Sequence, residues 1–211
     1  LGLDCMTTKS PSLDLDLFTD EAIANPYPLY EEIRNAGPAV WLEQYNMWAI
    51  SRFEDVRAAL RADSTLLSGT GVAMNDALNN TGSTNSLVSD GDEHRTLRSV
   101  VMKPMMPSAL RDIKEQMQQM SDELVDRLVA EDIFDGMTDF AHYLPVSMVS
   151  VLVGLPEKGR EQMLDWAAAS FNALGPMNER AMGSMPDLMA GIEYIRGLDR
   201  TALHPDGWAA G

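Results

Sequence analysis

Two side chains near the middle of the chain have the types and the spacing of an anion-binding site. His94 and Arg98 stand four residues apart in a segment that predicts a helix, so both fall on one face about one turn apart. Imidazole and guanidinium groups donate hydrogen bonds, and guanidinium does so through a fork that matches a carboxylate or phosphate. The pair predicts an anion clamp, although a solvated helix face with one ordinary histidine has the same spacing.

Basic residues gather around this pair in a chain that is otherwise acidic. The sequence has 32 acidic and 16 basic residues and a formal net charge of -16. Between residues 94 and 114 the only acid is Asp112, and the basic residues are Arg95, Arg98, Lys103, Arg111 and Lys114. Such an island can steer an acidic partner. The acidic balance argues against a nucleic-acid partner, because phosphate contacts need clustered Lys and Arg.

Other catalytic motifs are absent from the sequence. The three histidines, His94, His142 and His204, lie far apart and show no metal-ligand spacing. The single cysteine, Cys5, has no basic neighbour before Lys9, so nothing predicts an activated thiolate. One cysteine makes no internal disulfide, which favours a reducing, cytoplasmic setting. No apolar run approaches the length of a spanning helix, so no membrane partner is expected.

The elements ahead of the pair are predicted to be two helices and a β-hairpin. A helix over 29–35 ends at Gly37-Pro38. The apolar runs 39–42 and 47–50 are separated by four residues and predict a hairpin. A second helix follows from residue 51 or 52 through Leu60. Residues 64–91 are rich in Ser, Thr, Asn and Gly and predict a long loop, a feature that is usually functional or mobile.

Helices dominate the remainder of the chain. Asp92 is the expected N-cap of the helix that carries His94, and Pro104 and Pro107 interrupt it. Apolar residues at steps of three and four predict a long amphipathic helix over 110–128. The stretch 146–153 is apolar all round and predicts a fully buried helix. Two further helices are expected, over 159–174, with Met163, Ala167, Phe171 and Leu174 on one stripe, and over 186–203.

Four segments in this order resemble the N-terminal half of a soluble bacterial cytochrome P450. Residues 25–40 resemble the family's first helix and the start of its β1 hairpin, and residues 48–56 its second hairpin strand and B helix. Residues 90–98, of DxxEHxxLR type, resemble the start of the C helix and are the most specific match. Residues 145–156 resemble the E helix and its exit. The implied fold is mainly α with a small β-hairpin or sheet, covering helices A to G and ending before the I helix.

The resemblance assigns roles to individual residues. It implies that His94 and Arg98 donate to the haem propionates, in agreement with the clamp. The loop 64–91, with Leu87 and Val88, would close over the substrate, and Phe171 and Leu174 would lie on the F helix above it. A ferredoxin-type electron donor would dock near Arg95, Arg98, Lys103 and Arg111. The stretch 171–176 is similar to that of members that oxidise aromatic acids.

The resemblance also implies that the family's catalytic and metal-ligating residues lie beyond this chain. The I-helix residues and the axial cysteine would follow residue 211, and Cys5 stands outside the cysteine motif. We therefore expect residues 1–24 to be a flexible N-terminus, with Met6 a candidate start, and residues 25–211 to be a partial domain. The full-length protein would bind haem b and insert one oxygen atom of O2 into a small organic substrate. The 211-residue chain alone is expected neither to hold haem nor to catalyse.

Two alternatives from other functional classes stay open. An acidic helical module could bind an anionic ligand through His94 and Arg98 without haem. The chain could also be a non-functional remnant. The early hairpin and the long loop favour the enzyme, because a plain helical adaptor needs neither.

Overall fold

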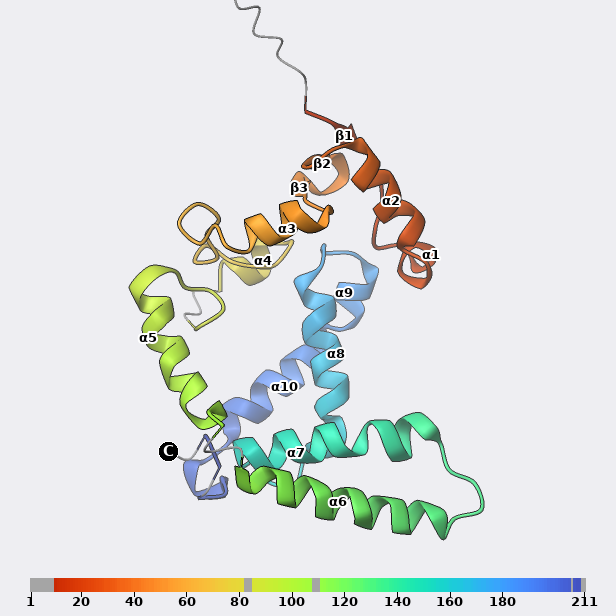
Figure 1. The fold of residues 1–211 in the computed structure, drawn as a ribbon, viewed down its shortest axis with the longest axis vertical. Helices are drawn as coiled ribbons and strands as arrows, with labels where there is room; N and C mark the ends of the chain where they lie inside the picture. Colours follow the sequence, from red (N-terminus) through yellow and green to blue (C-terminus); the bar gives the residue numbers. More distant parts are fainter. Residues whose placement is uncertain (1–9, 82–84, 108–110, 206, 210–211) are drawn as a thin grey trace, which may run out of the picture. The chain divides into compact units, whose positions relative to one another are not determined.

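The structure is a computed structural model that describes residues 10–81, 85–107, 111–205 and 207–209. Helices dominate these ranges, and a three-stranded sheet lies near the N-terminus (Figure 1). The predicted class, mainly α with a small sheet, is confirmed. The strands are β1 (Ser12–Leu13), β2 (Val40–Leu42) and β3 (Met47–Ala49). The helices are α1 (Asp20–Ala24), α2 (Tyr27–Ala36), α3 (Phe53–Ala59), α4 (Asp76–Asn79), α5 (Gly91–Met102), α6 (Arg111–Val129), α7 (Tyr143–Val153), α8 (Met163–Leu174), α9 (Glu179–Gly183) and α10 (Met185–Gly197).

The chain forms two compact units. The first comprises the residues up to His94 together with Gly175–Met177, and the second comprises Arg95–Leu174 and the residues from Asn178 onward. Helix α5 crosses the boundary between the two units along the chain. The division of the chain into these two units was not predicted from the sequence.

The sheet of the first unit is built around the predicted hairpin. Strand β2 pairs antiparallel with β3, with Val40 opposite Ala49, and the connection holds Asn46 in the left-handed region at φ 49°. Alternate residues of β2 point inward, so Val40 and Leu42 are buried with Ile33 of α2 in one core. The hairpin and the helix before it are therefore confirmed.

Regular structure begins earlier than predicted. Strand β1 pairs in parallel with β2, with Ser12 opposite Trp41, and helix α1 follows with Thr19 as its N-cap. The described part of the segment 1–24, expected to be flexible, thus contributes a strand and a helix. Leu13, Leu15 and Leu17 pack against the hairpin core, which supplies the burial that a two-residue strand needs.

Helices α6 and α7 of the second unit lie side by side, joined by residues 130–142 (Figure 1). Helix α6 confirms the predicted amphipathic helix, with Leu124 and Leu128 buried, whereas Leu110 lies outside the described residues. The predicted full burial of α7 is wrong. Val149 and Val151 are 48% and 37% exposed, because α7 packs against neighbours on only part of its circumference.

The face of α8 that is buried differs from the predicted stripe. Ala169 and Ala173 are buried, whereas Phe171 is 75% exposed. Helix α8 packs against α10, where the ring centroids of Trp166 and Tyr194 lie 4.8 Å apart. Small side chains on the inner face allow this close approach of the helices. The predicted end of α8 at Leu174 is confirmed, but α9 was not predicted.

Candidate functional site

Helix α5 carries the predicted clamp. His94 is half-buried, and its Nδ1 lies 2.7 Å from the carbonyl oxygen of Ser86. Because a carbonyl oxygen only accepts, Nδ1 carries the proton, which leaves Nε2 as the ring atom that can meet a ligand. Arg98 is exposed one turn further along the helix, and no ion pair holds it within the described part of the chain. The helix thus presents one imidazole nitrogen and one guanidinium group.

The start of α5 is fixed by Asp90. Its two carboxylate oxygens accept hydrogen bonds from the backbone amides of Ser68 and Gly69, at 2.9 Å and 2.7 Å. A Cβ atom at position 69 would lie 2.5 Å from Asp90 Oδ2, so glycine is required for this contact. The expected N-cap, Asp92, instead lies in the first turn, because the helix already begins at Gly91. Asp90 ties the beginning of the long loop to its end beside His94.

The loop 64–91 is irregular but internally bonded. Asn79 Oδ1 accepts from the amide of Ala73, and its Nδ2 donates to the carbonyl of the same residue, both at 3.0 Å. Asn75 caps α4 through the Leu78 amide, and its Nδ2 donates to the carbonyl oxygen of Gly175 at 2.8 Å. Gly175 belongs to the same unit as the loop and directly follows Leu174 in the chain.

The predicted substrate-contacting residues fall in different units. Leu87 and Val88 belong to the first unit, where Asn85 Oδ1 accepts from both of their amides. Phe171 and Leu174 belong to the second unit. Leu87 and Phe171 are exposed apolar side chains, at 59% and 75%. Their meeting around one substrate stays a prediction.

The predicted docking residues follow α5 and lie in the second unit. Arg95, Arg98, Lys103 and Arg111 are all exposed. Lys103 stands in a short 3-10 turn that ends α5, where Pro104 occupies one of the first positions. The interruption by proline is therefore confirmed, and the role of these cations stays a prediction.

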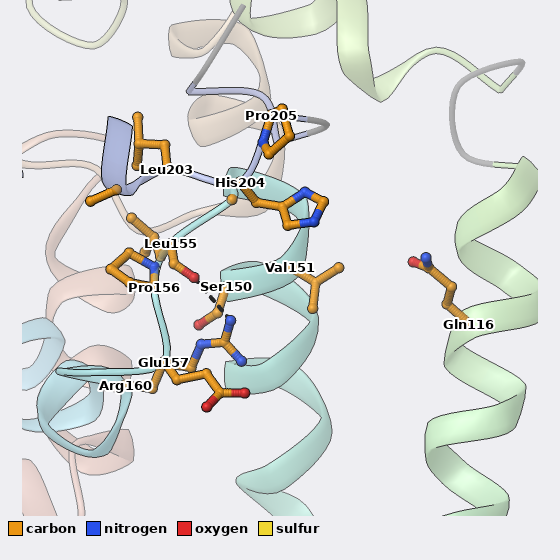
Figure 2. Close-up of a pocket in the computed structure, with 12 residues that line it drawn as sticks. Gln116, Ser150, Val151, Leu155, Pro156, Glu157, Arg160, Leu203, His204 and Pro205 are labelled. Carbon is orange, nitrogen blue, oxygen red and sulfur yellow. Dashed lines mark hydrogen bonds between the residues drawn. The ribbon is translucent and has the colours of Figure 1, made fainter. Parts of the chain in front are cut away.

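A cavity in the second unit was not anticipated from the sequence. It measures about 550 Å³ and lies where Gln116 of α6 faces Val151 of α7 (Figure 2). The E-helix exit at Leu155-Pro156 and the residues Leu203, His204 and Pro205 complete its wall. These segments are far apart in sequence, so no spacing rule would have grouped them.

Arg160 is one of the charged residues that line this cavity. Its Nη2 donates to the carbonyl oxygen of Leu155 at 2.9 Å, and its Nε is buried without a hydrogen-bond partner among the described residues. Glu157 lines the same wall (Figure 2). The guanidinium therefore serves first to hold the turn after α7, where it satisfies a carbonyl oxygen beyond the helix end.

The described residues hold neither a metal-binding cluster nor a membrane-spanning helix. Across the described residues, no three His, Cys, Asp or Glu side chains form a group that could hold a metal ion. Cys5 lies outside the described residues. No helix of the described chain has the length and apolar content needed to cross a membrane.

Sequence comparisons find similarity to curated proteins that are named cytochrome P450s. No family model matches the chain. Cytochrome P450 CYP199A2 of Rhodopseudomonas palustris is 30% identical over 205 residues, which cover 95% of this chain and 50% of that protein. Cytochrome P450 monooxygenase PikC of Streptomyces venezuelae is 29% identical over 209 residues, covering 92% of this chain and 48% of that protein. The chain spans about half the length of these curated relatives.

Comparison with solved structures supports the same fold. The cytochrome P450 PksS of Bacillus subtilis matches with a TM-score of 0.69 and 24% identity, covering 93% of this chain and 50% of that one. Full-length CYP116B46 of Tepidiphilus thermophilus matches with a TM-score of 0.71 and 20% identity, covering 92% of this chain and 28% of that one. The predicted resemblance and the predicted fold class are confirmed, and the matched length agrees with an N-terminal half.

Proposed function

Because this chain belongs to the cytochrome P450 family and spans about half the length of its relatives, we propose that it forms the propionate-binding, N-terminal part of a haem-thiolate monooxygenase. When bound, haem supplies the iron that activates O2. This part of the protein holds the cofactor's carboxylates and contributes to the substrate pocket.

The arrangement at α5 carries the proposal. Nδ1 of His94 is committed to the Ser86 carbonyl, so the ring is oriented and Nε2 is the ring atom left for a ligand. Arg98 adds a fork of donors four residues later. Two carboxylates, such as the propionates of one haem, match the two groups of this pair in number. Asp90 and Ser86 fix the helix start and the ring, as pre-organised cofactor sites require.

The finer assignments come from the family resemblance. A small organic substrate would contact Leu87, Val88, Phe171 and Leu174, and an aromatic acid is the class favoured by the stretch 171–176. The exposed apolar surface of Leu87 and Phe171 supports this role. An acidic ferredoxin-type donor would dock near Arg95, Arg98, Lys103 and Arg111, whose exposure supports contact with a partner.

The proposal can be tested by substituting the clamp residues, His94 and Arg98, in a protein that also contains the remaining half of the fold. We expect His94→Ala and Arg98→Ala each to weaken haem retention about tenfold or more, because each removes a hydrogen bond to a charged group. The measurement is the rate of haem transfer to excess apomyoglobin. Arg111→Ala, which removes an exposed charge outside the clamp, is the matched control. Haem retention that is unchanged in the double variant would falsify the propionate assignment.

A further inference from the structure

The cavity in the second unit has the size and the lining of a small-molecule site. Its volume of about 550 Å³ is typical of ligand pockets, which are mostly apolar with a few polar groups. No Phe, Tyr or Trp is among the described residues that line it, and its apolar side chains are aliphatic: Val151, Leu155, Pro156, Ala202, Leu203 and Pro205. An occupant that matches this lining has an aliphatic body.

Arg160 gives the cavity a charged donor that the described residues satisfy only in part. Its Nη2 donates to the Leu155 carbonyl oxygen at 2.9 Å, and its Nε is buried without a partner among the described residues. Glu157 lines the same wall (Figure 2), but within the described ranges its carboxylate forms no ion pair with Arg160. A buried charged donor without an acceptor is unfavourable, so the cavity favours a ligand that supplies one.

We propose that this cavity binds a small aliphatic carboxylate, such as a free medium-chain fatty acid, with its carboxylate on Arg160 and its chain against the aliphatic lining. A carboxylate matches the guanidinium fork in shape and in charge. The lining includes neither His94 nor Arg98, the two residues proposed to hold the haem propionates. The site therefore goes beyond the proposed function and can be tested without haem.

Calorimetric titration of the 211-residue chain with octanoate tests the site, and 1-octanol is the uncharged probe of the same length. We expect 1-octanol to bind about tenfold or more weakly than octanoate, because the alcohol lacks the charge that strengthens a hydrogen bond to guanidinium. Arg160→Met should weaken octanoate binding about tenfold or more and change 1-octanol binding less than about twofold. A variant that failed to fold would instead lose both ligands.

Two further variants separate the contributions of the lining and of the charge. Val151→Phe should abolish binding of both probes by filling the cavity, and its thermal unfolding should be unchanged because Val151 is 37% exposed. Glu157→Gln should tighten octanoate binding and leave 1-octanol binding unchanged, since it removes a like charge from the wall. Lys158→Met is the matched control, because Lys158 is exposed and is not part of the lining. It should change octanoate binding less than about twofold.

Equal octanoate affinity in Arg160→Met and the wild-type chain would overturn the role of the guanidinium. No binding of octanoate by the wild-type chain at millimolar concentration would overturn the site itself. Loss of octanoate binding in a protein that also contains the remaining half of the fold would overturn it as well, because another part of the protein would then fill the cavity.

Discussion

Single side chains that bond to the backbone position the segments around the helices. Thr19, Asn75 and Asn178 accept hydrogen bonds from backbone amides at the starts of α1, α4 and α9. Tyr45 works in a similar way at the sheet. Its hydroxyl accepts from the Leu17 amide at 3.0 Å and donates to Asp16 Oδ1, so it fastens the segment after β1 to the hairpin connection.

The Tyr45–Asp16 pair predicts a pH dependence. Burial, followed by the hydrogen bond to Asp16, raises the pKa of Tyr45 from 10.0 to about 12. The hydrogen bond from Tyr45, followed by that from the Phe18 amide, lowers the pKa of Asp16. The Tyr45 contribution to stability is therefore complete below pH 10 and is lost as pH rises toward about 12. The Asp16 contribution is present above the ordinary pKa of 3.8 and is lost as pH falls below it.

Tyr45→Phe tests this account. We expect it to lower the free energy of unfolding by about 1 kcal/mol at neutral pH, the usual value of one hydrogen bond. It should also raise the pKa of Asp16 and flatten the alkaline loss of stability. NMR titration of the Asp16 carboxyl and denaturant unfolding at several pH values measure these effects. An unchanged Asp16 titration would contradict the assigned hydrogen bond.

At the scale of elements, the end of α7 is closed by a distant segment. Helix α7 ends at Gly154, which holds φ at 83°. The amides of His204, Trp208 and Ala209 donate to the carbonyl oxygens of Gly154, Leu152 and Val153 at 2.9–3.1 Å. Carbonyls at a helix end lack partners within the helix, so this segment caps α7 and closes one side of the cavity. The approach needs two glycines, because a Cβ on Gly154 would lie 2.8 Å from Gly207 Cα.

Gly207→Ala should loosen this cap. A Cβ at position 207 would meet the backbone of Gly154 and Val153, and backbone has no flexible end that can give way. We expect a loss of about 1–3 kcal/mol in unfolding free energy, the usual cost of overpacking. The Trp208 and Ala209 amides should also exchange faster with solvent. Gly197→Ala is the control, since nothing lies within 4 Å of its Cβ position, and it should be neutral or slightly stabilising. Equal effects of the two substitutions would argue against the close approach.

At the scale of the whole molecule, the chain corresponds to about half the length of its curated relatives. Helix α5 presents His94 and Arg98, while Val149 and Val151 of α7 and Ile133 between α6 and α7 are exposed. The relatives extend over about twice the matched length. We therefore infer that the residues enclosing the cofactor are shared between this half and the other half of the fold.

The 211-residue chain by itself should retain no haem after purification. Contacts to the propionates alone would leave the haem ring exposed to water. The thiolate ligand of the iron belongs to the other half of the family's fold. The measurement is the absorbance of the reduced, CO-treated protein. A stable band at the thiolate position from the chain alone would show that this half builds a haem site without the other.

Local sequence signals predicted several elements and placed His94 and Arg98 on one helix. Periodicity located α6, turn residues located the β2–β3 hairpin, Gly175-Pro176 marked the end of α8, and the four-residue spacing identified His94 and Arg98. These features depend on neighbours within one or two turns, so their signals are local. The family pattern around residues 90–98 is equally local.

Tertiary structure alone decided which surfaces are buried and which distant segments meet. The two residues of β1 become a strand only because β2 lies beside them. The buried face of α8 is the alanine face, since α10 packs there and leaves Phe171 exposed. The exposed valines of α7 and the cap formed by His204, Trp208 and Ala209 depend on contacts between segments tens of residues apart. Hydropathy indicates whether a side chain favours burial, but the packing of the folded chain determines whether that side chain is buried.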